Sequence, residues 1–242
     1  MIDFAEALAA AQRDAGGRGI GTLGEKTLHL ALKYFCAPDP ETHERPLGGF
    51  VADAVTEDGV FEIQTRGLNR LKPKLHAFLP LCPVTVVHPV IAEKLLIRVD
   101  EAGELLLKRR SPKHETPLSA MREIYPLREY LADPRFRIML CELELAEYSV
   151  QHSKSRREKC DRVPVALRRI HMLETPADYA AFLPEPLPDP LTSAALAAAL
   201  HTAELPARLY LNLLGRMGIL AEAGRAGRLK CWKRTGFDDI RR

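Results

Sequence analysis

The stretch FVADAVTEDGVFEIQT, residues 50–65, predicts a β-hairpin with carboxylates inside its strands. Two apolar, β-branched runs flank Asp58-Gly59, a dipeptide that favours a two-residue hairpin turn. A turn there makes Asp53 and Glu62 diagonal neighbours on one face, with Cβ atoms roughly 7–8 Å apart. Two carboxylates at that spacing suit a divalent cation, so this face is a candidate site.

The competing interpretation is an ordinary sheet with one solvated face. Two observations count against it. Val55 and Val60 share the face of the carboxylates, which is a poor composition for a freely wet surface. The segment that follows, RGLNRLKPKLHAFL, is basic and favours an anionic substrate. The opposite face is apolar enough to pack on helices.

The order of elements around the hairpin resembles the PD-(D/E)xK (restriction endonuclease-like) nuclease superfamily. The shared order is an acidic helix, a strand with Asp, a strand with Glu-x-Lys, a helix and another strand. The resemblance covers about residues 20–90, where Asp53 matches the aspartate and Glu62-Ile63-Gln64 the (D/E)xK motif. The chain also resembles an uncharacterised bacterial family with the pattern GGFVAD…EIQTRG.

The resemblance implies an α/β fold, with a restriction-endonuclease-like mixed sheet flanked by helices. It also implies Mg²⁺-dependent hydrolysis of DNA phosphodiesters, with Mn²⁺ as the other candidate metal. The implied catalytic residues are Asp53, Glu62 and Gln64, and the implied metal ligands are Asp53, Glu62 and Glu25.

Gln64 stands where the superfamily has lysine, and a glutamine brings no positive charge to the phosphate. Arg66, Lys72 or Lys74 could supply that charge. The departure keeps two other interpretations open. One is a non-catalytic DNA-binding regulator on a degenerate nuclease core, and the other is a protein-interaction module with a structural acidic pair.

Glu25 allows two compatible readings. Thr22-Leu23-Gly24-Glu25 fits a helix capping box, and Glu25 also lies three residues before Leu28, on the inward face of an expected helix at 22–35. The nearby run 19–24 matches GxGxxG. Dinucleotide binding is disfavoured, because a helix-like run rather than a strand precedes it.

The last 52 residues predict a winged helix-turn-helix. From Leu191 onward, nine Lys/Arg stand against four Asp/Glu. Two helices, with Thr192 or Ser193 and Thr202 as caps, precede a hairpin with a basic tip at GRAGR. The predicted DNA contacts of the whole chain are Arg66, Lys72, Lys74, Arg208, Asn212, Arg216, Arg225 and Arg228. The alternative is a packing or dimerisation domain, and a homodimer fits either interpretation.

The remaining sequence sets the organisation. The predicted division is a core with a β-rich extension at 1–183, a proline-rich linker at 184–191 and the winged helix at 192–242. Further elements are expected as helices at 3–14, from 69 and at 116–131, strands at 83–90, 136–150 and 165–174, a hairpin at 94–109 that turns at Glu101–Gly103, and a charged loop at 151–162.

Composition predicts a soluble cytoplasmic protein. The five cysteines are scattered without a CxxC pair, which indicates neither a disulfide framework nor a zinc site. No apolar run approaches a membrane span, and the acidic start is unlike a secretory signal.

Overall fold

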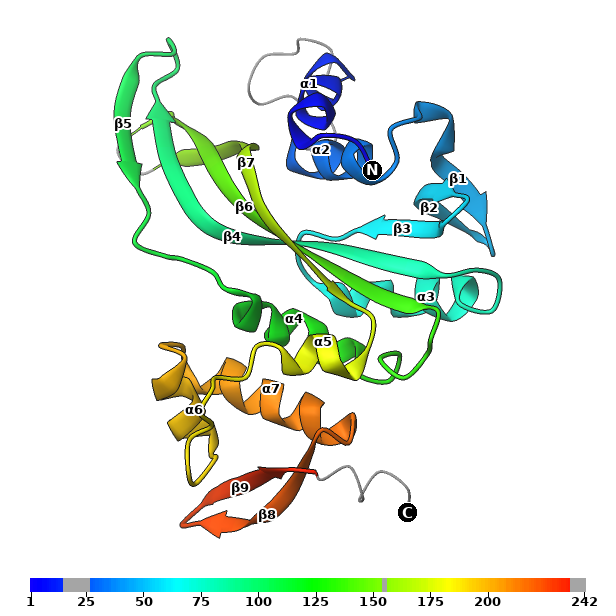
Figure 1. Cartoon of the computed structure of the whole chain (residues 1–242). Coiled ribbons are helices and arrows are strands. Elements are labelled where there is room, and N and C mark those ends of the chain that lie inside the picture. The colour runs from blue at the N-terminus through cyan, green and yellow to red at the C-terminus, as the bar shows by residue number, and fades with distance from the viewer. Residues whose placement is uncertain (15–26, 154–155, 236–242) are drawn as a thin grey trace.

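A mixed β-sheet forms the centre of the fold in a computed structural model that describes residues 1–14, 27–153 and 156–235 (Figure 1). Within those residues, seven strands are ordered β1-β2-β3-β4-β6-β7, with β5 paired to β4. Their bounds are β1 His43–Leu47, β2 Phe50–Thr56, β3 Gly59–Ile63, β4 Val84–Val99, β5 Leu105–Arg110, β6 Phe136–Gln151 and β7 Arg157–Leu173. Strands β3, β4 and β6 are parallel, and the other neighbours are antiparallel.

Helices flank both faces of this sheet, as the sequence predicted (Figure 1). The first layer is α1 (Phe4–Asp14) and α2 (Thr27–Cys36), which share an apolar cluster with Ala54, Phe61 and Ile63. The other face carries α3 (Lys72–Phe78), α4 (Met121–Ile124) and α5 (Pro176–Ala180). Short 3-10 turns lie at Pro40–Thr42, Leu68–Leu71, Pro117–Ala120 and Tyr125–Leu127. The single helix expected at 116–131 is therefore broken, because Pro126 lacks the N–H that a continuing helix needs.

The hairpin turn is displaced from the predicted position. Thr56 pairs with Gly59, so Glu57-Asp58 form the turn rather than Asp58-Gly59. The register consequently moves by two residues, and Asp53 comes level with Glu62 instead of diagonal to it. A shift of two preserves the faces, because side chains alternate with a period of two. The expected grouping of Val55, Val60 and Glu62 on one face therefore survives the error. The alternation of β2 is interrupted at Asp53, because Ala52 joins the apolar cluster on the α3 face and Ala54 the cluster on the α2 face.

Two strands are longer than predicted. The strand expected at 83–90 is joined in β4 to the first strand of the expected hairpin, so that β4 continues for 16 residues. The hairpin itself is confirmed, since β5 pairs antiparallel with the end of β4. The charged loop expected at 151–162 is wrong in its second half, because β7 begins at Arg157. Pairing with β6 continues to Arg157 and holds these charged residues extended. Hydrogen bonding across a long neighbour thus overrides the local preference for a loop.

The C-terminal segment forms two helices and a hairpin: α6 (Ser193–Ala199), α7 (Glu204–Arg216), β8 (Leu220–Ala226) and β9 (Leu229–Arg234). Thr192 caps α6 as predicted, its side chain accepting from the Ala195 N–H. The cap predicted at Thr202 is wrong, since α7 starts after Ala203 without a side-chain cap. The buried face of α7, centred on Ala207, Tyr210 and Leu214, joins the apolar cluster beneath the sheet.

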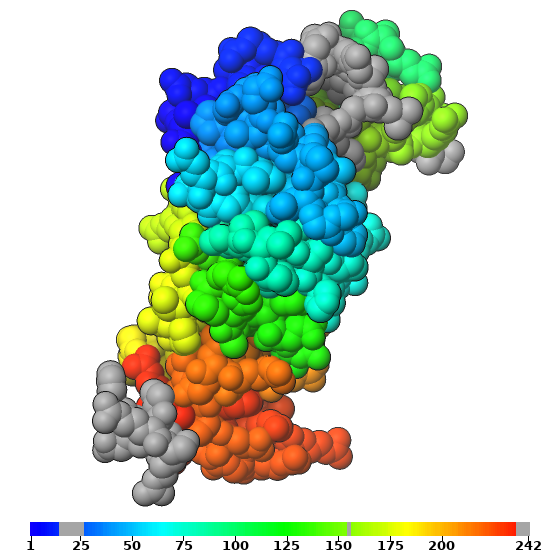
Figure 2. All heavy atoms as spheres, turned by 90° about the vertical axis from the view of Figure 1, so that its right-hand side faces the viewer, coloured from blue at the N-terminus to red at the C-terminus, as the bar shows by residue number. Residues whose placement is uncertain are grey.

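The layers stack into an elongated molecule, with α1 and α2 at one end and β8 and β9 at the other (Figure 2). The core cluster runs without interruption across the proline-rich segment, through Leu183, Leu191 and Leu196. The hydroxyl of Tyr210 donates to the Tyr179 carbonyl at 2.5 Å and ties α7 to α5. In the described parts of the chain, no helix combines the length and apolarity needed to cross a membrane.

Replacing Gly59 by alanine should destabilise the fold by about 3 kcal/mol. Gly59 has a φ of +113°, and a Cβ atom there would lie 2.3 Å from the Pro83 carbonyl oxygen, which is backbone and cannot yield. Gly103→Ala is the matched control, because its φ is +87° and nothing lies within 4 Å of the added carbon. The control should cost about 1–2 kcal/mol. Urea unfolding measures the stability of both variants. Equal losses of stability would contradict the close approach of Gly59 to the Pro83 carbonyl.

Candidate functional site

The two predicted carboxylates lie where β2 and β3 separate. Backbone pairing of the hairpin ends at Ala54–Phe61. Beyond it, side chains replace the ladder: the Ile63 N–H donates to Asp53 Oδ2 at 2.7 Å, and the Asp53 N–H donates to Glu62 Oε1 at 3.3 Å. Asp53 and Glu62 are thus held side by side by the backbone of the opposite strand.

Glu62 is buried and has one cationic partner. Only 2% of its side chain is exposed, and Lys74 Nζ on α3 donates to Glu62 Oε1 at 3.0 Å and to Oε2 at 2.8 Å. Burial raises the pKa of Glu62, and the nearby Asp53 charge raises it further, while Lys74 lowers it. Of the three cations predicted to compensate for Gln64, Lys74 is therefore the one at the carboxylates.

The other two cations lie elsewhere. Lys72 forms an ion pair with Glu129 on the outer surface. This hydrogen bond lowers the pKa of Glu129, with a smaller effect from Arg216. Arg66 is exposed and lines a cleft next to the end of β3.

Gln64 directly follows β3 and contacts neither carboxylate through a hydrogen bond. Its Nε2 donates to the Arg66 carbonyl at 2.7 Å, and its backbone carbonyl lies 2.7 Å from His88 Nδ1. The side-chain oxygen Oε1 makes no hydrogen bond to a described residue. That oxygen is the atom of Gln64 that remains for a ligand.

His29 is a site residue that the sequence analysis missed. It projects from α2, and its Nε2 lies 3.6 Å from Asp53 Oδ2. Helices α2 and α3 cover opposite faces of the sheet. Asp53 therefore lies near His29 from the α2 layer, and Glu62 pairs with Lys74 from the α3 layer. In the sequence His29 follows Glu25 by four residues, a spacing that could have drawn attention to it. Glu25 itself, with the run 19–24, lies outside the described residues.

The two carboxylates present oxygen atoms that a divalent cation could use. Across residues 1–14, 27–153 and 156–235, no group of three or more His, Cys, Asp or Glu side chains is arranged to hold a metal. The oxygens present are Asp53 Oδ1, which has no hydrogen bond to a described residue, and the Glu62 carboxylate beside it, both of whose oxygens accept hydrogen bonds from Lys74. Two hard oxygen donors fit Mg²⁺, which commonly binds one or two carboxylates and keeps its remaining waters.

The predicted DNA contacts of the C-terminal segment lie at the surface. Arg208, Arg216, Arg225 and Arg228 are exposed, whereas Asn212 is half-buried and its amide donates to the Arg208 carbonyl at 2.9 Å. Trp232 of β9 packs on Gly215 of α7, where an added Cβ would approach its ring to 2.4 Å. An isolated antiparallel bridge joins Trp232 to Leu191, before α6. The sequence analysis did not foresee this third strand position beside the hairpin.

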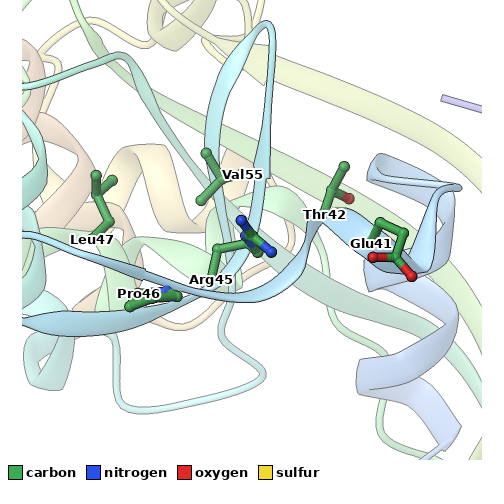
Figure 3. Close-up of a pocket in the computed structure, with 6 residues that line it drawn as sticks. All are labelled: Glu41, Thr42, Arg45, Pro46, Leu47 and Val55. Carbon is green, nitrogen blue, oxygen red and sulfur yellow. The ribbon is translucent and has the colours of Figure 1, made fainter.

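A second hollow lies beside β1, at the edge of the sheet (Figure 3). Its volume is about 560 Å³, and its charged lining residues are Glu41 and Arg45. Asp53 and Glu62 are not part of it. With one charge of each sign beside Thr42 and three apolar residues, the lining of this hollow does not favour an anion.

Comparison with known proteins places the chain in a family. Residues 26–174 match the family described as Domain of unknown function (DUF8091), and the chain belongs to it. That span contains Asp53, Glu62 and Lys74 and ends after β7. An "Uncharacterized protein" of Treponema pallidum (strain Nichols) is 38% identical over 113 residues, which is 46% of this chain and 45% of that relative. The match thus spans less than half of the relative's length. No solved structure matches the chain significantly.

Proposed function

We propose that this member of the DUF8091 family hydrolyses DNA phosphodiesters with Mg²⁺, or with Mn²⁺ in its place. The observation that carries the proposal is the convergence of Asp53, Glu62 and Lys74 where β2 and β3 separate. The element order supports it as well: α2, β2 with Asp53, β3 with Glu62, α3 and then β4 parallel to β3. This is the order that the resemblance to PD-(D/E)xK nucleases implies.

Each residue has a role in this proposal. Asp53 and Glu62 would hold the metal, which supplies an activated water and neutralises charge on the phosphate. Lys74 supplies the positive charge that Gln64 lacks, and Gln64 Oε1 orients the water. His29 positions Asp53. In the reaction the water would lose a proton to solvent as its oxygen bonds to phosphorus. The bond from phosphorus to the leaving sugar oxygen breaks, and that oxygen takes a proton from solvent in return.

The C-terminal segment would bring DNA to this site as a winged helix. Support comes from the succession of α6, α7 and the β8–β9 hairpin, with Leu191 as a third strand position beside β9. Arg208, Arg216, Arg225 and Arg228 are exposed for phosphate contacts. The division of the chain into a core and a winged helix, with a linker at 184–191, remains a prediction. The five cysteines are free, which suits the cytoplasm.

The second candidate is a non-catalytic DNA-binding regulator on the same core. Lys74 favours it, because its Nζ occupies both oxygens of Glu62 and could replace a metal permanently. Gln64 favours it too, since its amide is turned to the Arg66 carbonyl.

Cleavage of DNA should require a divalent metal and Asp53. Purified protein is incubated with supercoiled, linear and branched DNA in Mg²⁺, Mn²⁺ or EDTA, beside Asp53→Asn. We expect cleavage with metal, none in EDTA, and a loss of about 100-fold or more in the variant. Asp58→Asn, at the exposed tip of the same hairpin, is the matched control and should cleave normally. Absence of cleavage with every substrate, together with salt-sensitive binding, would support the regulator instead.

A further inference from the structure

A cleft of about 550 Å³ lies between the sheet and the start of α7. Its walls come from the end of β3, the middle of β4, the segment before α4 and residues 201–203 and 206. Four cationic side chains line it: Arg66, Lys113, Arg122 and Arg162. Arg162 is half-buried, and burial lowers its pKa, because desolvation disfavours the charged guanidinium.

These four cations have no carboxylate partner within ion-pair distance among the residues that the structure describes. The two carboxylates of the cleft are engaged by the backbone instead. Glu115 Oε2 accepts from the Ile91 N–H, and Glu123 Oε2 accepts from the N–H groups of Gly67 and Leu68. Four cations against two carboxylates leave the cleft with an excess of positive charge, and an anion bound there would offset it.

His88 adds a hydrogen-bond acceptor to this cationic cleft. Its Nδ1 donates to the Gln64 carbonyl, since a carbonyl oxygen can only accept. Burial lowers the pKa of His88, which keeps the ring neutral and leaves Nε2 unprotonated. Inorganic phosphate needs only the cations. A sugar hydroxyl or a base amino group would use the acceptor as well.

The geometry points to a nucleotide-binding cleft: Arg66, Arg122 and Arg162 bind the phosphate, and His88 accepts from the sugar or base. The volume suits a ligand of nucleotide size. Gln64 contacts both Arg66 and His88. Because Gln64 lies two residues after Glu62, the cleft adjoins the candidate site. The phosphate could belong to a nucleic-acid strand or to a free nucleotide. We choose the strand, and this choice rests on the proposed function.

Binding without cleavage tests the cleft. A fluorescent single-stranded DNA of about ten nucleotides is titrated in EDTA, at several salt concentrations, with wild type, Arg66→Gln, Arg122→Gln and Arg162→Gln. Each variant should weaken binding by about threefold to tenfold and lower the salt slope by about 0.7, the contribution of one phosphate contact to single-stranded binding. Arg135→Gln is the control, because Arg135 is an exposed arginine directly before β6 and outside the cleft.

Two further arms separate the sources of the ligand. A deoxynucleoside 5′-monophosphate and inorganic phosphate are titrated separately against wild type and Arg66→Gln. Loss of oligonucleotide binding alone assigns the cleft to a strand, whereas loss of mononucleotide binding assigns it to a free nucleotide. Unchanged binding in Arg66→Gln and Arg122→Gln would overturn the inference, because both side chains are exposed and their replacement should leave the fold intact.

The outcome is independent of catalysis. If cleavage fails in every condition but these variants lose binding, the nuclease proposal falls and the cleft stands. If cleavage occurs and the variants bind and cleave normally, the cleft inference falls alone.

Discussion

Replacing Lys74 by methionine should lower the free energy of unfolding by about 3 kcal/mol, because it leaves the Glu62 carboxylate buried without a cation. The loss lies at the low end for buried pairs, since 25% of the Lys74 side chain is exposed and water reaches the pair. Methionine keeps most of the length of lysine, so the change removes charge more than packing. Urea unfolding at pH 7 provides the measurement.

The matched control is a double-mutant cycle with Glu62→Gln. That single variant should be much less damaging, because the Lys74 ammonium can turn to water. The double variant should recover most of the stability that Lys74→Met loses. A double variant as unstable as Lys74→Met would show that Lys74 acts through packing rather than charge.

The Lys74→Met deficit should also shrink in acid. Burial and Asp53 raise the pKa of Glu62, and loss of Lys74 raises it further. Below its ordinary value of 4.5, the carboxyl is protonated in the folded and the unfolded chain, and the penalty disappears. Above pH 4.5 the Glu62 carboxyl ionises in the unfolded chain before it ionises in the folded chain. The variant therefore loses stability as the pH rises, until the pH passes the raised pKa of Glu62 in the folded chain. A deficit equal at pH 4 and pH 7 would contradict this account.

Glu62→Gln should abolish metal-dependent cleavage, with a loss of about 100-fold to 1,000-fold and little change in stability. The amide keeps the shape of the side chain but removes the negative charge and one oxygen donor from the metal site. The rate of cleavage under saturating Mg²⁺ provides the measurement, with unfolding curves to verify the fold.

Glu57→Gln is the control for this variant. Glu57 lies in the exposed turn of the same hairpin, so the Glu57→Gln variant should cleave DNA as the wild type does. Wild-type cleavage by Glu62→Gln would remove Glu62 from the reaction. Loss of cleavage in both variants would point to the hairpin's conformation rather than to its carboxylates.

Much of the fold follows from residues 50–65 and their surroundings. The mixed sheet with helices on both faces was predicted, as were both strands of the hairpin. The turn was misplaced, because Asp58-Gly59 favours a turn locally, while Gly59 is needed for its close approach to Pro83. Strand β7 was cut short for a similar reason. The charged residues at the start of β7 predict a loop locally. They form a strand because β6 is long enough to pair with them.

The candidate site was predicted only in part. Asp53 and Glu62 lie side by side as expected, but hydrogen bonds to the backbone of the opposite strand hold them there, rather than regular alternation along the two strands. Lys74 was one of three equal candidates, and His29 was not foreseen. Their selection depends on how α2 and α3 pack across the sheet, and no local periodicity encodes that packing.

The sequence by itself therefore determined the local pattern: the helices, the strands, the faces of the hairpin and the basic C-terminal segment. These depend on intervals of two to four residues, over which backbone geometry and side-chain chemistry suffice. The tertiary structure alone decided which cation neutralises Glu62 and how Arg66 and Arg162, far apart in the chain, come to line one cleft. Such long-range choices arise from burial and strand pairing, whose free energies depend on the whole folded chain.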